Sequence, residues 1–504
     1  MLADFTNEVI GDLVTKNLGS LLSESFLINA LRPALSSGVD ELLHKELLLK
    51  AEVIAGQLRE HGAKPNEPIH VLVSNRPSDI AAIVGVWLAD GVIVPISRAS
   101  PEDVLHKIQK KTNARFLIDY QAFDEVPKIR MTSSSNISEL DVLKDAAFII
   151  FTSGSTGEPK GVVVSHQAFI GKLYEIDKLL SFNEQDRLLL VLNINFVFGL
   201  WLALLTLLKG GAVYLHEKFN PEDFIHALAN NAITRVGVVP TMMRVVFSKP
   251  DVVDQIEKKV NTGCLKQILM GGESLGRSLA VKVREQFSKT ELIDIYGSTE
   301  TASCDFFSFP DTFSQYPGAI GKPAGGVTYR IVDADNEPVQ AGVEGELQIC
   351  SPYLMNCYLG EDELTQKAFS GPWFKTGDIA KEVGPSVVEL MGRSKELISR
   401  GGNKMTPGEI EQAICSHPSV AAAMAVGIAD DVLGERIHML IIPNPSNQIS
   451  VSEIKTHLRM RLEKFKIPDV FYFDVALPIG RTGKADRAEF KRQILSGVLI
   501  AALH

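Results

Sequence analysis

Short apolar runs alternate with helix-patterned segments between residues 69 and 295. The runs at 69–73 and 92–96, for example, are separated by a helical pattern at 80–88, and Gly91 breaks that helix. Strands that alternate with helices form βαβ units, in which parallel strands are covered by helices. We therefore expect a large α/β domain on largely parallel sheets. The same alternation continues through the apolar runs 187–192, 212–215, 236–239, 267–270 and 292–295.

The pattern changes after Asn336 to short alternating strands with Gly and Pro turns, and changes again near residues 392–395. A chain of 504 residues is too long for one ordinary core, so at least two domains are expected. The predicted architecture is an α/β N-terminal body of parallel-rich sheets and helices with a short β-rich subdomain, followed by a small α+β lid domain. The predicted boundaries are 1–391 for the body, 392–395 for a hinge and 396–504 for the lid.

Charge and cysteine content narrow the class of protein. A net charge of −10 and a pI near 5.7 leave no broad basic field for nucleic acid. The five cysteines lack C-x-x-C spacing, which is typical of reduced thiols in a cytoplasmic protein. No secretory signal is evident, and the longest apolar stretch, 196–208, is too short to span a bilayer. We expect a cytoplasmic protein with no membrane span and no nucleic-acid partner.

One loop between two apolar runs is unusually rich in phosphate-binding groups. Residues 152–161 contain four hydroxyl side chains, three glycines and one lysine. Glycine lets backbone N–H groups approach phosphate oxygens, hydroxyls donate hydrogen bonds and lysine adds a positive charge. An ordinary solvated turn needs fewer such residues, and the spacing is not that of a Walker A motif. The predicted nucleotide-binding residues of this loop are Thr152, Ser153, Gly154, Ser155, Thr156, Gly157 and Lys160.

This loop resembles the T-S/T-G-S/T-T-G-x-P-K-G signature of the adenylate-forming superfamily, which includes acyl- and aryl-CoA synthetases, peptide-synthetase adenylation domains and luciferases. Three further family motifs follow in the family's order, and the resemblance covers roughly residues 40–490. It implies an AMP-forming carboxylic acid–thiol ligase. Such an enzyme uses ATP and Mg²⁺ to make an acyl-AMP, releases pyrophosphate and transfers the acyl group to a thiol such as CoA. The weakly patterned residues 1–35 are interpreted as an extension atypical of the family.

A second motif, Asp294-Ile295-Tyr296-Gly297-Ser298-Thr299-Glu300, ends an apolar run. Its carboxylate Glu300 is a hard oxygen ligand suited to Mg²⁺, and Thr299 can donate to an anionic oxygen. A helix cap is the alternative interpretation. The match to the family's Y-G-x-T-E motif implies that Glu300 holds Mg²⁺, Thr299 contacts the α-phosphate and Asp294 contacts the adenine amino group. Tyr296 and Gly297 would belong to the same nucleotide site.

A third segment, residues 270–274, also follows an apolar run. Its glycines allow a flat ring to lie against bare backbone, although an ordinary turn has the same composition. By resemblance, Gly272, Glu273 and Ser274 would line one face of adenine, with Tyr296 on the other face. Gly271 would border the acid substrate.

One pair of residues near the domain boundary and one lysine near the C-terminus complete the site. A carboxylate at Asp378 can accept two ribose hydroxyls and Arg393 can add a planar donor, although a surface ion pair is the alternative. The resemblance assigns both to the ribose. Lys484 matches the lysine of the P-x-x-x-x-G-K pattern, which stabilises charge as the carboxylate attacks the α-phosphate. Without the other motifs it would be interpreted as an exposed turn lysine.

The hinge and the thiol route are predicted from glycine-rich junction sequence. Glycines at a domain junction can absorb large φ/ψ changes. In the family the C-terminal domain rotates here, which presents first the catalytic lysine and then a tunnel for a thiol. Lys395 occupies the hinge position and Gly402 aligns with the border of that tunnel. Only 20 residues follow Lys484, too few for a carrier domain, so a separate acceptor is expected.

The class of acid substrate is predicted from a missing carboxylate in the segment around residues 195–196. Amino-acid-activating relatives have Phe-Asp where this chain has Asn195 and Phe196, so the anion that would pair with an α-ammonium is missing. Residues 400–404 and 433–436 favour aryl- or short acyl-activating relatives. We expect a small carboxylic acid without an α-amino group and CoA as the thiol. The alternatives are a stand-alone enzyme that loads a free-standing carrier protein, and an inactive nucleotide-binding regulator.

Overall fold

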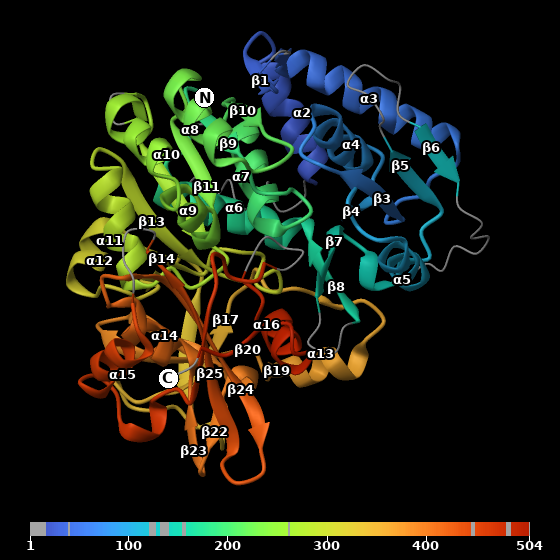
Figure 1. Ribbon diagram of the computed structural model, residues 1–504. Coiled ribbons are helices and arrows are strands. Elements are labelled where there is room, and N and C mark those ends of the chain that lie inside the picture. Colours follow the sequence, from blue (N-terminus) through green and yellow to red (C-terminus); the bar gives the residue numbers. More distant parts are fainter. Residues whose placement is uncertain are drawn as a thin grey trace.

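The computed structural model of the chain describes residues 17–38, 41–119, 128–131, 141–153, 158–260, 263–444, 449–479 and 485–502. Figure 1 shows a larger upper part, coloured blue to yellow, that holds the two large sheets and most of the helices. A smaller part, coloured orange to red, lies below it. The α/β architecture predicted from the alternation of strands and helices is confirmed.

The first large sheet has nine strands. Its central strands β13, β12, β11, β9, β10 and β1 are parallel neighbours, as βαβ units require. Antiparallel strands lie at both edges. In order across the sheet, the strands are β15 (Lys322–Pro323), β14 (Phe306–Ser308), β13 (Glu291–Tyr296), β12 (Gln267–Gly271), β11 (Arg235–Val238), β9 (Arg187–Leu190), β10 (Ala212–Leu215), β1 (Pro33–Ser36) and β2 (Glu41–Leu43).

The second large sheet has seven strands and carries the phosphate loop. Its strands β7 and β8 are antiparallel and enclose that loop, with Thr152 opposite Lys160. The predicted strand–loop–strand arrangement therefore holds for the two flanks. Across the sheet the strands are β18 (Cys357–Tyr358), β8 (Pro159–Ser165), β7 (Ala146–Ser153), β4 (Val92–Ser97), β3 (Pro68–Val73), β5 (Phe116–Asp119) and β6 (Lys128–Met131).

Helices pack around these sheets, and the buried apolar side chains between them form several separate clusters, of which one is much larger than the others. Helix α7 is buried along nearly its whole length, which explains its almost unbroken apolar sequence. No helix in the described ranges is long and apolar enough to cross a membrane. The helices of this part are α2 (Leu18–Ile28), α3 (His44–Glu60), α4 (Pro77–Leu88), α5 (Glu102–Thr112), α6 (His166–Leu180), α7 (Val197–Leu208), α8 (Pro221–Asn230), α9 (Pro240–Phe247), α10 (Pro250–Gln255), α11 (Arg277–Gln286), α12 (Pro310–Gln315) and α13 (Asp362–Ala368).

The described part of residues 1–35 belongs to the folded body and is not an appended segment, while its interpretation as atypical of the family stays a prediction. Helix α2 buries Leu18, Leu22 and Phe26 completely in the main core, and β1 pairs in parallel with β10. The short helix has only three fully buried large side chains, and its partners lie far away in the sequence. Its local pattern was therefore too weak to predict its burial.

Two further sheets follow. The first contains β16 (Thr328–Val332), β17 (Gly345–Cys350), β20 (Trp373–Gly384), β19 (Phe369–Ser370) and β21 (Val387–Arg393). The second contains β23 (Asn403–Met405), β22 (Ile398–Arg400), β25 (Gly434–Pro443), β24 (Val420–Asp430) and β26 (Val470–Phe473).

Helices α14 (Pro407–Cys415), α15 (Val451–Arg459) and α16 (Arg487–Leu495) accompany the last sheet. The last sheet and these helices have apolar clusters of their own, on both faces of β24 and β25. The hinge at 392–395 stays a prediction. Strand β21 ends at Arg393, and a 3₁₀ turn, Ser394–Glu396, follows.

Candidate active site

Three predicted ribose and adenine residues meet at one point. Asp378 and Arg393 lie directly opposite each other on β20 and β21, and Arg393 Nε lies 3.0 Å from Asp378 Oδ1. The hydroxyl of Tyr296, the last residue of β13, donates a 2.6 Å hydrogen bond to Asp378 Oδ2. Burial raises the pKa of the Asp378 carboxyl, while the Arg393 charge and the Tyr296 hydroxyl act in the opposite direction. Each carboxylate oxygen keeps a second acceptor site for a hydroxyl of a ligand.

The metal-ligand candidate Glu300 lies in the loop that follows Tyr296. The hydroxyl of Tyr358 donates a 2.9 Å hydrogen bond to Glu300 Oε1, and burial raises the pKa of Tyr358. The ammonium of Lys160 lies 5.4 Å from the centroid of the same tyrosine ring. Tyr358 therefore connects the end of the phosphate loop with the proposed metal ligand. Sequence reasoning missed this tyrosine because β18 is only two residues long and shows no periodicity.

The donor set around Glu300 suits Mg²⁺. The charge of Glu300 helps to raise the pKa of Arg393, whose guanidinium pairs with Asp378, and among the described residues no group of three or more His, Cys, Asp or Glu side chains could form a protein-only metal cage. Mg²⁺ typically binds through one or two carboxylates together with phosphates and water. The second oxygen of Glu300 is not engaged by any described residue. A single carboxylate beside a phosphate loop fits that pattern.

Glu273 connects the adenine segment with the end of the chain. Its carboxylate accepts hydrogen bonds from the Thr241 hydroxyl at 2.8 and 3.0 Å, and Arg244 Nη1 lies 3.5 Å away. The backbone N–H of Ala485 also donates to Glu273 Oε1, at 3.2 Å. Lys484 itself lies outside the described residues. Its neighbour Ala485 is nevertheless anchored beside the predicted adenine segment.

The remaining predicted nucleotide-binding residues differ in how far they are buried. Gly272 and Ser274 are exposed, whereas Asp294 lies on β13, where burial raises the pKa of its carboxyl to about 7. A Cβ added to Gly297 would lie 2.3 Å from the backbone nitrogen of Cys304, so a glycine is needed there to close the loop. Thr152 is the penultimate residue of strand β7 and is half-buried. Gly154, Ser155, Thr156 and Gly157 lie outside the described residues, and for Ser153 only the backbone is described.

The predicted acid-binding residues surround the start of α7. Phe196 is the N-cap of that helix, and Asn195 precedes it with a buried Oδ1 that has no partner among the described residues. Gly271, at the end of β12, faces a different aromatic ring. A Cβ added there would lie 3.3 Å from Phe198, which stacks on Trp201 at 5.8 Å. Phe198 was not predicted as a site residue, because its spacing is equally that of a core position.

Lys395, in the predicted hinge, and Gly402, in the predicted lid, are both exposed. Lys395 is in the 3₁₀ turn after β21, and Gly402 is in the turn between β22 and β23 with a φ of +80°. Such a φ favours glycine. No contact between Gly402 and the predicted nucleotide residues is seen in the described part of the chain, so its role at a thiol route stays a prediction.

Comparison with known proteins identifies the family. Residues 29–359 match the AMP-binding enzyme family, and residues 409–484 match the AMP-binding enzyme C-terminal domain. The chain therefore belongs to the AMP-binding enzymes, the adenylate-forming superfamily that the sequence motifs predicted. The predicted class, an AMP-forming ligase, is confirmed at the level of this family, whose members among the relatives include a feruloyl-CoA synthase and a 2-succinylbenzoate–CoA ligase.

The relatives include both single enzymes and large synthetases. The chain is 26% identical to feruloyl-CoA synthase of an Amycolatopsis species, over 91% of this chain and 95% of the relative. It is 27% identical to tyrocidine synthase 3 of Brevibacillus parabrevis, over 88% of this chain but only 7% of that protein. An anthranilate CoA ligase solved with anthranoyl-AMP shares the fold, with a TM-score of 0.86 at 21% identity. The aligned region covers 97% of this chain and 100% of the ligase.

Proposed function

We propose that this chain activates a carboxylic acid without an α-amino group as its acyl-AMP and then transfers the acyl group to CoA. The observation that carries the proposal is the single short loop from Tyr296 to Glu300. One end of it binds the ribose candidate Asp378, and the other end presents the metal candidate Glu300 beside Tyr358. A nucleotide that spans these two points would extend its phosphates toward Lys160, whose ammonium lies over the Tyr358 ring.

The proposed mechanism depends on positioning and charge neutralisation, because both reactants are anions. Asp378 would accept the ribose hydroxyls while Tyr296 and Arg393 hold its carboxylate in place. When bound at Glu300, Mg²⁺ would neutralise phosphate charge. Thr299 would donate to an α-phosphate oxygen. Lys484 would stabilise the charge that develops as the acid attacks, and the bond from Ala485 to Glu273 supports its delivery to the site.

The choice of acid rests on the start of α7. Neither Asn195 nor Phe196 provides the carboxylate that would pair with an ammonium group, and a buried ammonium without a partner is strongly disfavoured. The unpartnered Oδ1 of Asn195 is suited to a neutral donor. CoA is the proposed acceptor, as in the feruloyl-CoA synthase relative. The tyrocidine synthase relative supports a second candidate, transfer to a separate carrier protein.

A cytoplasmic location, where ATP and CoA are available, is part of the proposal. All five cysteines are free thiols, and burial raises the pKa of Cys304 and Cys415 to about 12. Thiols held in this protonated state are poor nucleophiles, so they suit structural roles.

The direct test is ATP–pyrophosphate exchange with a panel of aryl, short acyl and amino acids in the presence of Mg²⁺. We expect exchange with one or more acids that lack an α-amino group, and a thioester when CoA is added. Lys484→Ala should reduce exchange by orders of magnitude and leave ATP affinity nearly unchanged. Lys491→Ala, an exposed lysine on α16, serves as the matched control.

Each other outcome has a defined meaning. Exchange without a thioester would favour loading of a carrier protein. Exchange that requires an α-amino acid would contradict the proposed substrate class. No exchange with any acid would overturn the proposal and favour the nucleotide-binding regulator.

A further inference from the structure

A buried ion pair lies directly behind the loop that carries Thr299 and Glu300. Lys172, on α6, places its Nζ 2.8 Å from Oδ1 of Asp305, and both side chains are 0% exposed. The same ammonium lies 3.4 Å from the carbonyl oxygen of Cys304 and 5.3 Å from the centroid of the Tyr353 ring. Among the residues that the structure describes, neither charged group forms a hydrogen bond or an ion pair with a predicted nucleotide residue.

Asp305 connects this ion pair to the loop by hydrogen bonds. Its second oxygen, Oδ2, accepts a hydrogen bond from the hydroxyl of the fully buried Thr301. That hydroxyl oxygen accepts in turn from the backbone N–H of Ser298, at 3.1 Å. The backbone N–H of Asp305 donates to the carbonyl of Tyr296 at 2.7 Å and closes the loop at its base. Ser298 and Thr301, the two residues that flank Thr299 and Glu300, are thus bonded to each other and, through Thr301, to the ion pair.

The backbone of this loop is strained on the side next to the pair. Ala302, Ser303 and Cys304 have φ values of +54°, +78° and +45°, so three consecutive residues that are not glycine adopt the left-handed region. Left-handed conformations are unfavourable for residues with a Cβ, and they persist only where surrounding contacts impose them. The contacts from Lys172 to Cys304 and Asp305 are at the end of this run.

We propose that Lys172 and Asp305 are positioning residues that hold the strained loop in the conformation in which Thr299 and Glu300 face the nucleotide. This inference rests on the proposed adenylating function. A buried ion pair contributes little net stability compared with apolar residues of similar size, so stability alone does not account for it. Its connection through Thr301 to the loop accounts for its location.

The principal test replaces both members together, in Lys172→Met/Asp305→Leu, because removal of one alone would leave a buried unpaired charge. Paired apolar replacement is often neutral for folding. We expect a melting temperature within a few degrees of wild type, at least a tenfold loss in the rate of acyl-adenylate formation, and a higher Mg²⁺ concentration for half-maximal rate.

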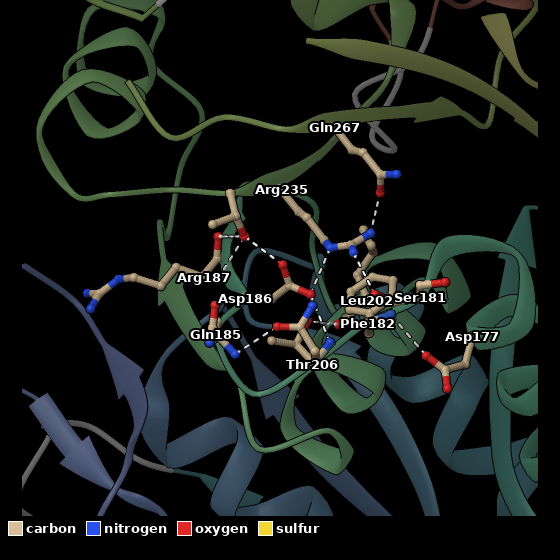
Figure 2. A network of polar contacts seen from close by, with 12 residues as sticks. Asp177, Ser181, Phe182, Gln185, Asp186, Arg187, Leu202, Thr206, Arg235 and Gln267 are labelled. Atoms are coloured by element: carbon tan, nitrogen blue, oxygen red, sulfur yellow. Dashed lines mark hydrogen bonds and ion pairs between the residues drawn. The ribbon is translucent and has the colours of Figure 1, made fainter. Parts of the chain in front are cut away.

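A matched control lies at the other end of the parallel strands. Arg235, at the start of β11, pairs with Asp186 at 3.0 Å, and their side chains are 5% and 0% exposed. Figure 2 shows this pair within a polar network that includes Gln267 and the carbonyl of Ser181. We expect Arg235→Met/Asp186→Leu to change stability without changing the Mg²⁺ dependence of the folded enzyme.

A single-residue variant keeps the inference testable if the double variant fails to fold. Thr301→Val removes the link to the loop and leaves the ion pair intact, so it should reproduce both the loss in rate and the higher Mg²⁺ concentration for half-maximal rate. Thr206→Val is its control. That threonine is also fully buried, and its hydroxyl donates only to the Leu202 carbonyl, at 2.8 Å (Figure 2).

The outcomes separate this inference from the proposed function. Normal rates and normal Mg²⁺ dependence in both the double variant and Thr301→Val would overturn the positioning role. If the wild-type chain shows no exchange with any acid, the proposed function fails. The positioning role would then be decided by calorimetric titration of ATP at several Mg²⁺ concentrations, where equal binding by wild type and variants would contradict it.

Discussion

The hydroxyl of Tyr358 donates to Glu300 Oε1 at 2.9 Å while the face of the same ring lies 5.4 Å from the Lys160 ammonium. One side chain on a two-residue strand therefore contacts both the proposed metal ligand and the single lysine of the phosphate loop. Strand β18 owes this position to its pairing with β8, where Tyr358 lies opposite Val162.

Tyr358→Phe should weaken the response to Mg²⁺. The substitution keeps the ring under Lys160 and removes only the donor to Glu300, and the loss of one hydrogen bond corresponds to about 1 kcal/mol. We expect the Mg²⁺ concentration for half-maximal exchange to rise about three- to tenfold. Tyr472→Phe should have no such effect, because it removes a hydroxyl bonded to His438 in the predicted lid. An unchanged Mg²⁺ titration for Tyr358→Phe would contradict the role given to this hydroxyl.

Asp378→Asn should reduce recognition of the ribose. Asn keeps one acceptor oxygen but loses the charge that pairs with Arg393, and hydrogen bonds to charged groups contribute about 1.5–3 kcal/mol. We expect the KM for ATP to rise at least tenfold, with kcat reduced less.

ATP analogues that lack one ribose hydroxyl provide the control for the role of Asp378. If the carboxylate binds ribose hydroxyls, the wild-type enzyme should prefer ATP to 2′-deoxy- and 3′-deoxy-ATP, and the variant should lose at least one of those preferences. Equal discrimination in both proteins would show that Asp378 acts elsewhere. Tyr296→Phe should have a smaller effect in the same direction, since it removes only a donor to Asp378.

Glu273→Ala should slow the adenylation half-reaction more than thioester formation. Its carboxylate holds the N–H of Ala485, next to Lys484, against the larger part of the chain. At saturating ATP we expect a slower burst of acyl-AMP and an unchanged rate of thiol transfer from acyl-AMP supplied directly. Glu273→Gln keeps an acceptor oxygen, so its rate of acyl-AMP formation should lie between those of the wild type and Glu273→Ala. Equal loss in both half-reactions would indicate that Glu273 serves nucleotide binding alone.

The local alternation of strands and helices was sufficient to predict the parallel sheets, whereas the roles of the motif residues stay predictions that rest on the family resemblance. Asp378 and Arg393 could be paired in function only through the family resemblance, and the structure shows them as cross-strand neighbours. Contacts that join distant segments were not predictable. Tyr358 meets Glu300 across 58 positions, and Lys172 meets Asp305 across 133. Periodic sequence patterns do not predict contacts between distant segments. In addition, a lysine in an amphipathic helix such as α6 is ordinarily assigned to the surface.

The buried histidines predict how stability depends on pH. Burial lowers the pKa of His44, His70 and His166 from 6.5 to about 4 in the folded chain. The unfolded chain therefore binds more protons between these values, so each histidine contributes stability that is fully present above pH 6.5 and lost as the pH falls toward 4. The loss amounts to about 3 kcal/mol for each residue at most.

His166→Asn isolates one of these contributions. The Nδ1 atom of His166 accepts a 3.1 Å hydrogen bond from the N–H of Leu18, and the amide oxygen of Asn can replace that acceptor. We expect the wild type to be more stable than the variant at pH 7.5, and this advantage to shrink as the pH falls to 4.5, measured by urea unfolding at each pH.

Asp294→Asn should give the opposite dependence. Burial raises the pKa of the Asp294 carboxyl from 3.8 to about 7, so the folded chain binds the extra proton between these values. Stability therefore falls as the pH rises through this range, and the variant should gain on the wild type between pH 4.5 and 7.5. A difference in unfolding free energy that stays constant with pH would show that Asp294 titrates normally. It would then be ionised throughout the range in which ATP is bound, and its proposed acceptance of the adenine amino group would need no change in protonation.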